Sequence, residues 1–311
     1  MRLVGLTIVR NEEDILEASL RHNLRALDAI AVVDHGSDDR TPEIVAGLAS
    51  EGLAIESARE EAIEYRPSGL ATAHMRRLLA AGAERVVLVD ADEFLRIPAR
   101  EAFDREVSKA GAGTPIAIAA SIHRIAFDRG AGIAGKLRHA QRRDEPRAPS
   151  WRPVVDRAAL DRPGAAIADG RDSVVAGGDF VPMHRVDAAV ASVAHVPVRS
   201  AEQFTAKAAV GYLACLLAGE QESAIRREWA EAYRAILAGA RYDEEALAAI
   251  VARYGTDRDG AGPVTTRWVD DPIDVAAALR YTGDEPPRPL ARVLAFGERV
   301  AAEIARTTGG L

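Results

Sequence analysis

Short apolar runs alternate with amphipathic stretches along the first part of the chain. Four of these runs are rich in Val, Ile and Leu and end at polar residues, which is typical of buried strands. They cover Leu3 to Val9, Ala29 to Val33, Leu53 to Glu56 and Arg85 to Val89. Strands that alternate with helices in this way predict an α/β fold, with parallel strands covered by helices on both faces.

Helix signals lie between these strands. Asn11 is predicted to cap the first helix, which carries an apolar stripe that begins at Ile15. Thr41-Pro42-Glu43 predicts a second helix, because proline is favoured at the first helical position and an acid in the first turn. Ser68 is predicted to cap a third helix that ends near Gly82.

The pattern becomes less regular later in the chain. Residues Pro115 to Ile122 and Val190 to Val198 predict two further strands, and the second of these carries His195. Ser200-Ala201-Glu202-Gln203 has the form of a capping box, so a helix is expected to begin there. The rest of the chain reads as mostly helical.

We expect residues 1–200 to form an α/β domain and residues 201–311 to form a helical region packed on it. A basic stretch with several Gly and Pro residues, 124–157, has two interpretations: a solvated loop, or a mobile flap that meets an anionic or hydroxylated substrate. Its cations are Lys136, Arg138, Arg142, Arg143, Arg147 and Arg152.

Acidic residues gather at the end of the fourth predicted strand, in Asp90-Ala91-Asp92-Glu93. The packing of a strand end does not require several acids, whereas Mg²⁺ and Mn²⁺ take oxygen ligands of this kind and share them with substrate phosphates. Arg10-Asn11 and Asp34 to Ser37 follow two other strands. Since ligands of such sheets bind at the carboxyl ends of the strands, the three segments are expected to converge.

Composition limits the classes of function. The net charge of −7 over 311 residues argues against general nucleic-acid binding, which requires a basic surface. Cys215 is the only cysteine, so no intrachain disulfide can form, which fits a cytoplasmic location. The longest apolar stretch, Ala208 to Ala218, falls short of the ~20 residues of a membrane span. We expect no transmembrane segment and leave peripheral membrane contact open.

Three motifs on the predicted strand ends resemble those of the family-2-like nucleotide-sugar glycosyltransferases. They are Val9-Arg10-Asn11-Glu12, then Val33-Asp34-His35-Gly36-Ser37-Asp38-Asp39-Arg40-Thr41, then Leu88-Val89-Asp90-Ala91-Asp92-Glu93-Phe94-Leu95. The third is similar to the signature of the Asp-x-Asp-Glu-Phe-Leu subgroup. The later string His195-x-Pro-x-Arg199-Ser200-x-Glu202-Gln203-Phe204-x-x-Lys207 also resembles that subgroup. The resemblance covers roughly residues 1–215.

This resemblance implies a glycosyltransferase-A fold with a Rossmann-like mixed sheet, a nucleotide-diphosphate sugar donor and a divalent metal, Mn²⁺ or Mg²⁺. By analogy Asp92 binds the metal directly, and Asp90 holds the ribose or a metal-bound water. His195 is the candidate third ligand, since neutral imidazole suits Mn²⁺. The alternatives are a solvated turn with capping acids for the two aspartates and a satisfied core residue for the histidine.

The nucleotide is expected to contact residues on several elements. Asp34 can accept a base N–H or a ribose hydroxyl, although the same string is prone to form a turn. Arg10 and Asn11 follow the first strand and lie within reach of the base or diphosphate. Arg199 and Lys207 can neutralise the diphosphate, with ordinary helix-surface charge as the alternative.

An inverting glycosyltransferase requires a general base for the acceptor hydroxyl. We choose Asp172 over Asp169 and Asp179, which lie in the same region, while a plain loop acid remains the alternative for each. The expected activity is metal-dependent, inverting transfer of a sugar, with a UDP-sugar as the expected donor by family frequency.

Two rival functions stay open. A nucleotidyltransferase on a similar sheet would use the same metal but attack the α-phosphate of a nucleoside triphosphate, and it usually carries a Gly-rich basic first loop that this chain lacks. A non-catalytic sugar- or nucleotide-binding protein is the second rival. The apolar faces of the C-terminal helices could serve a homodimer or pack on the first domain.

Overall fold

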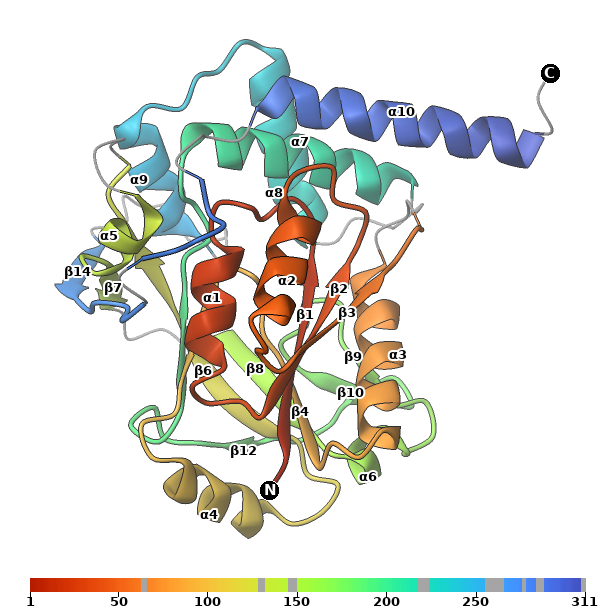
Figure 1. Ribbon diagram of the computed structural model, residues 1–311, viewed down its shortest axis with the longest axis vertical. Coiled ribbons are helices and arrows are strands. Elements are labelled where there is room, and N and C mark those ends of the chain that lie inside the picture. The colour runs from red at the N-terminus through yellow and green to blue at the C-terminus, as the bar shows by residue number, and fades with distance from the viewer. Residues whose placement is uncertain are drawn as a thin grey trace.

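The computed structural model describes residues 1–62, 66–127, 132–144, 150–217, 224–254, 266–275, 278–283 and 288–308 (Figure 1). In these residues an 11-stranded sheet runs through the molecule in the order β14-β7-β6-β8-β4-β1-β2-β3, with β12, β13 and β5 attached beside β6. Its strands are β1 (Leu3–Val9), β2 (Ala29–Asp34), β3 (Ile55–Arg59), β4 (Arg85–Leu88), β5 (Glu93–Arg96), β6 (Ile116–Arg124), β7 (Gln141–Asp144), β8 (Ser150–Val155), β12 (His184–Arg185), β13 (Ser192–His195) and β14 (Arg267–Asp270).

The sheet is mixed. β1 pairs in parallel with β2 and β4, and β2 pairs in parallel with β3, so the alternating pattern correctly predicted a parallel core. β8 then runs antiparallel between β4 and β6. A separate small sheet consists of β9 (Ala166–Ile167), β10 (Val174–Ala176) and β11 (Asp179–Phe180). This arrangement is the Rossmann-like mixed sheet that the resemblance implied.

Helices cover both faces of the sheet (Figure 1). Alternate residues of a strand point to opposite faces. Leu3 and Val9 of β1 therefore pack with α1, α2 and α4, whereas Val4 and Ile8 pack with α3 and α6. The helices of the first part of the chain are α1 (Leu16–Asn23), α2 (Thr41–Ser50), α3 (Pro67–Ala80), α4 (Arg100–Ala110), α5 (Ile133–Leu137) and α6 (Arg157–Leu160).

Two of the predicted helix caps are wrong. Asn11 does not cap α1, which begins at Leu16; Asn11 has a left-handed φ of 59°, and its side-chain oxygen accepts a hydrogen bond from Asp38 N–H at 2.9 Å. Ser68 lies inside the first turn of α3 and donates its hydroxyl to the carbonyl of Ile167. In both places a partner distant in sequence takes the side chain that the local pattern assigned to the helix end.

The C-terminal part contains α7 (Ala201–Leu217), α8 (Ala224–Leu237), α9 (Glu244–Arg253) and α10 (Pro289–Thr308). The predicted capping box is confirmed at α7, because Ser200 Oγ accepts the Gln203 N–H at 3.0 Å. β14 lies in this region and pairs with β7, so the part after residue 200 also adds a strand to the main sheet. No helix among the described residues is long and apolar enough to cross a membrane.

The basic stretch 124–157 is ordered in its described parts, where it forms α5, β7 and β8. Arg124 stacks on Trp268 with 4.6 Å between the guanidinium carbon and the ring centroid, and Arg143 donates to the carbonyl of Tyr254 at 2.8 Å. These two arginines therefore hold the C-terminal part in place. Arg147 lies outside the described residues.

Candidate active site

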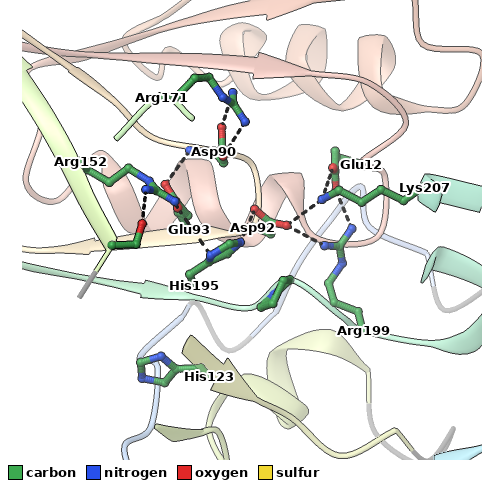
Figure 2. A network of polar contacts seen from close by, with 12 residues as sticks. Glu12, Asp90, Asp92, Glu93, His123, Arg152, Arg171, His195, Arg199 and Lys207 are labelled. Atoms are coloured by element: carbon green, nitrogen blue, oxygen red, sulfur yellow. Dashed lines mark hydrogen bonds and ion pairs between the residues drawn. The ribbon is translucent and has the colours of Figure 1, made fainter. Parts of the chain in front are cut away.

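Asp92 lies at the centre of a buried network of charges beside the carboxyl ends of β1 and β4 (Figure 2). The residue is 2% exposed. Its Oδ2 atom lies 2.9 Å from Lys207 Nζ and 3.4 Å from Arg199 Nη1, and its Oδ1 atom lies 3.5 Å from His195 Nε2. Burial alone would raise the pKa of Asp92, but Lys207, His195 and Arg199 together hold that pKa well below its usual range. Asp92 is therefore a carboxylate.

The partner strand β13 explains how His195 reaches this network. β13 pairs antiparallel with β5 and parallel with β6, and the register places His195 opposite Glu93. The predicted strand is confirmed, and it delivers the histidine next to the acidic segment. The ring of His195 also meets the ring of Tyr254 edge to face, with centroids 5.4 Å apart. His195 is thus held between the acids and an aromatic side chain.

Arg199 connects the start of α7 to the loop that follows β1. Its guanidinium donates to Glu12 Oε2 at 2.5 Å and to Asp14 Oδ2 at 2.6 Å, and the side chain is 2% exposed. Burial disfavours the charged form, but Asp14, Glu12 and Asp92 together raise the pKa of Arg199 above its ordinary value. Because three carboxylates hold it, Arg199 fixes the position of Asp92 and the loop.

Glu12 shares the cations of this network with Asp92. Burial raises the pKa of Glu12, while Lys207 and Arg199 oppose that effect. Lys207 Nζ lies 3.5 Å from Glu12 Oε1, and the pKa of Lys207 is raised against burial by Asp92 and Glu12. The side chain of Lys207 is 35% exposed, in contrast to that of Arg199. Lys207 is therefore the cation of this network that solvent and a ligand can reach.

Asp90 points to a different partner from Asp92. Its Oδ1 and Oδ2 atoms lie 2.7 and 2.8 Å from the two terminal nitrogens of Arg171, as a two-point ion pair (Figure 2). Arg171 adopts a left-handed φ of 57° in the turn that presents it. Burial raises the pKa of Asp90, and Arg171 acts against this. Asp90 and Asp92 are thus neighbours in sequence with separate counter-charges.

Glu93 forms a third ion pair, with Arg152. Glu93 is fully buried, and Arg152 Nε donates to its Oε1 at 2.7 Å. The Asp90 N–H donates to Glu93 Oε2 at 3.0 Å, and His195 Nδ1 lies 3.8 Å from Oε1. Burial would raise the pKa of Glu93, but Arg152 and His195 lower it. Arg152 therefore belongs to the site, and for this residue neither the solvated-loop nor the flap interpretation is correct.

A divalent cation fits part of the predicted ligand set. Two ligands of one octahedral ion with bonds of about 2.1 Å lie about 3 Å apart, and the 3.5 Å between Asp92 and His195 is close to that spacing. The described residues contain no group of three side chains that could hold a metal ion, and Asp90 is paired with Arg171. The structure thus brings Asp92 and His195 together, and it does not bring Asp90 to them as a third ligand.

Three of the predicted nucleotide residues, Arg10, Asn11 and Asp34, lie at the ends of β1 and β2, where two linked loops begin. Asp34 Oδ1 accepts the Ser37 N–H at 2.8 Å and its Oδ2 accepts from Arg59 Nη1 at 2.7 Å, so the turn interpretation of Asp34 is confirmed. The Asn11 N–H donates to Ser37 Oγ at 2.9 Å. The guanidinium of Arg10 lies 5.0 Å from the ring centroid of Phe296. A role for Arg10, Asn11 and Asp34 in nucleotide binding stays a prediction.

Asp172, the predicted general base, is exposed, and its Oδ1 accepts the hydroxyl of Ser173 at 2.9 Å. Its neighbour Arg171 reaches the acids instead. Sequence reasoning missed four residues of the network, since their partners lie far away in the chain and no local spacing marks them. They are Glu12, Asp14, Arg152 and Arg171.

Part of the chain is similar to proteins of a known family. Residues 6–125 match the family model described as glycosyl transferase family 2. No protein of curated function matches the chain. The chain is similar to a solved mannosyltransferase, PcManGT from Pyrobaculum calidifontis in complex with GDP-Man and Mn²⁺, with 18% identity, 83% of this chain and 81% of that chain covered, and a TM-score of 0.37.

A second similar structure is TarS 1–349 of S. aureus, with 14% identity, 76% of this chain and 71% of that chain covered, and a TM-score of 0.34. A third is a putative glucose-1-phosphate thymidylyltransferase from Bacillus anthracis, with 10% identity, 71% of this chain and 97% of that chain covered, and a TM-score of 0.34. The matched segment contains the second half of β1, all of β2 and β4, and the Asp90–Glu93 turn, and it includes the acids described above. Through residues 6–125, which are less than half of the chain, the protein is thus similar to glycosyl transferase family 2, and its mixed α/β sheet has the Rossmann-like form of the glycosyltransferase-A fold.

Proposed function

We propose that the protein transfers a sugar from a nucleotide-diphosphate donor to an acceptor hydroxyl with inversion at the sugar carbon, and that it requires a divalent cation. A UDP-sugar is the proposed donor. The observation that carries the proposal is the pair of Asp92 and His195, 3.5 Å apart, with Lys207 beside them. The leaving diphosphate gains negative charge as the bond between sugar and oxygen breaks, so cationic groups positioned there lower the barrier.

Asp92 and His195 would hold the cation, and the remaining ligand positions would be taken by water and the diphosphate. When bound, a divalent cation supplies Lewis-acid stabilisation of the departing diphosphate. Lys207 supplies a second positive charge, because its partly exposed amine lies 2.9 Å from Asp92 and can turn to a phosphate oxygen. Arg199 is too enclosed by Glu12 and Asp14 to leave them, so we assign it the positioning of Asp92.

Asp90 is proposed to act on the donor through its ordered carboxylate, either at the ribose or at a metal-bound water, while Arg171 keeps it in place. Asp172 is proposed as the base that accepts the proton of the acceptor hydroxyl. Its exposed position on the turn after Arg171 leaves it accessible to an acceptor from solvent. An Asp172→Asn variant is expected to lose activity and to keep the donor affinity of the native protein.

A thermal-shift screen tests the donor and the cation together. Nucleotide sugars with uracil, guanine, thymine and adenine bases are each added with and without Mn²⁺ or Mg²⁺. A ligand that binds only the native state stabilises it by about 2.7 kcal/mol at a concentration of 100 times Kd, which raises Tm by several degrees. We expect one nucleotide sugar to raise Tm only when the cation is present.

A product assay then separates transfer from its rivals. Release of nucleoside diphosphate supports glycosyl transfer, and release of pyrophosphate from a nucleoside triphosphate supports nucleotidyl transfer. A Tm increase without any release, in the presence of a range of hydroxyl acceptors, would identify a binding protein. Chelation of the cation with EDTA should abolish the release of nucleoside diphosphate, and full activity in EDTA would contradict the metal requirement.

A further inference from the structure

Helix α10 packs against the part of the protein that carries the predicted nucleotide residues. Phe296 packs with Val210 and Ala214 of α7, and Val293 and Val300 flank it. Figure 1 shows α10 crossing the molecule beside α7, next to the end of the sheet where the β1 and β2 loops lie. The apolar face of the helix thus fixes its position relative to α7, and its polar side chains are brought to the two loops.

Two arginines of α10 bind these loops directly. Arg292 Nη2 lies 2.6 Å from Glu13 Oε1, and Arg292 Nη1 lies 2.9 Å from Asp38 Oδ1, so one guanidinium joins the loop after β1 to the loop after β2. About two helical turns further along, Arg299 Nη1 donates to the carbonyl of Gly36 at 2.5 Å. Gly36 has a left-handed φ of 69°, and a Cβ built there would lie 2.1 Å from the Arg299 guanidinium.

Phe296 makes the third contact, since the guanidinium of Arg10 lies 5.0 Å from the centroid of its ring. Phe296 is 3% exposed, so this stacking takes place at a buried position, where cation–π attraction is stronger than at an exposed one. Arg10 follows β1 directly and is one of the predicted nucleotide residues. Its guanidinium is therefore oriented by a residue that lies 286 positions later in the chain.

The two loops are also bonded to each other. The Asn11 N–H donates to Ser37 Oγ at 2.9 Å, and the Asp38 N–H donates to Asn11 Oδ1 at 2.9 Å. The Glu13 N–H donates to Asp39 Oδ2 at 3.2 Å. These bonds and those of α10 hold both loops in one conformation. Since ordering a loop on binding costs affinity, a loop that is ordered beforehand binds its ligand more tightly.

We propose that α10 is a clamp on the donor-nucleotide site, in which Phe296 and Arg299 are positioning residues that set nucleotide affinity. The inference rests on the proposed function, because that function assigns Arg10, Asn11 and Asp34 to the nucleotide. Phe296 fixes the direction of Arg10, and Arg299 fixes the turn at Gly36 that follows Asp34. The clamp acts through the loops, so it should affect donor binding and leave the chemical step unchanged.

The test compares Phe296→Leu and Arg299→Ala with a matched control on the same helix. Arg306→Ala is the control, since within the described part of the chain Arg306 pairs with Glu303 of the same helix, at 2.5 Å, and it is 73% exposed. Calorimetric titration with UDP, GDP, CDP and dTDP, each with Mg²⁺, first finds the diphosphate that the native protein binds. Each of the two variants should then raise the Kd of that diphosphate about tenfold and raise the KM of the donor by a similar factor. The kcat should change less than about twofold. Arg299→Lys should restore part of the affinity.

Hydrogen exchange gives a readout that needs no ligand. Amides of residues 34–40 should exchange faster in Arg299→Ala than in the native protein and the Arg306→Ala control, with no change in β1 or β4. Unchanged exchange and unchanged Kd in a folded Arg299→Ala variant would overturn the clamp, and so would tighter nucleotide binding, which would make α10 a cover that blocks the site. If the native protein bound none of the diphosphates, the proposed function would fail, and the clamp with it.

Discussion

Lys207 Nζ lies 2.9 Å from Asp92 Oδ2, although the two residues are 115 positions apart in the chain. The negative charge of the Asp92 carboxylate is therefore neutralised by a lysine of α7 when no ligand is bound. The same oxygen lies 3.4 Å from Arg199 Nη1. A phosphate that binds Lys207 would compete with Asp92 for the amine. Asp92 Oδ2 would then lose its lysine partner and could bind a cation instead, so diphosphate binding and cation binding are linked.

Asp92→Asn is expected to reduce both activity and stability. Loss of one group that stabilises charge in the transition state typically costs about 10²–10³ in kcat. The free energy of unfolding should fall by about 1–3 kcal/mol, because Arg199 and the partly exposed Lys207 lose a charged partner. Steady-state turnover and urea unfolding measure the two effects.

The double variant Asp92→Asn with Lys207→Met separates these effects. Removal of the unbalanced lysine should recover part of the unfolding free energy and none of the activity. The control is Lys109→Met, because Lys109 is an exposed lysine paired with Glu106, and it should change stability by less than about 0.5 kcal/mol. If Asp92→Asn lowered stability alone and kept full turnover, a catalytic role for Asp92 would be wrong.

The Glu93–Arg152 pair provides a test of the buried part of the network. Arg152→Met leaves the fully buried Glu93 without its counter-charge, which should cost about 3–5 kcal/mol of unfolding free energy. Glu93→Gln together with Arg152→Met should cost much less than the sum of the single variants, because both charges are removed. A double-mutant cycle in urea measures the coupling, and additivity of the two single changes would contradict the pair.

The sequence predicted the parallel core well, because the residues of β1, β2 and β4 are apolar in runs that only buried strands tolerate. It also predicted that Asp92 and His195 would share a site, through motifs on elements that the fold brings together. The ion pairs Asp90–Arg171 and Glu93–Arg152 could not be predicted, since each depends on chain packing across 81 and 59 positions. The predicted cap at Asn11 was wrong for the same reason, because the partner of its side chain is Asp38, which lies in another loop.

Glu17 is expected to anchor the C-terminal segment to α1. Its carboxylate is fully buried and accepts the N–H groups of Arg280, Tyr281 and Thr282 at 2.8 to 2.9 Å. Burial opposes the charge, but these bonds and Arg21 lower the pKa of Glu17. Glu17→Gln should therefore reduce the unfolding free energy by about 2–4 kcal/mol at pH 7, since hydrogen bonds to a charged group are worth about 1.5–3 kcal/mol each.

The lowered pKa also fixes the sign of the pH dependence for Glu17. Its contribution to stability is present above the unfolded pKa of about 4.3 and is lost as pH falls through the lower folded value. The difference in unfolding free energy between the native protein and Glu17→Gln should accordingly become smaller at acid pH. Glu43→Gln, at an exposed position in the first turn of α2, serves as the control. An equal effect of both substitutions would contradict the anchor.

Asp39 should make stability fall as pH rises, in the opposite direction to Glu17. Its side chain is 1% exposed and accepts the Thr41 N–H at 2.8 Å, and burial raises its pKa to about 6. In the unfolded chain the same group titrates near about 3.9. The stabilising effect of the neutral form is therefore complete below about pH 4 and is lost between about pH 4 and 6.

Asp39→Asn removes this titration, because the amide stays neutral at every pH. The difference of about two pKa units corresponds to about 3 kcal/mol, so the variant should gain about 2–3 kcal/mol relative to the native protein between pH 4 and 7. Loss of a carboxylate acceptor for the Glu13 N–H adds only an offset that does not change with pH. Urea unfolding at several pH values measures the trend, with Asp161→Asn at a 64% exposed position as the control. A difference in unfolding free energy that stayed constant from pH 4 to 7 would show that the native environment leaves the pKa of Asp39 where the unfolded chain has it, and it would contradict this prediction.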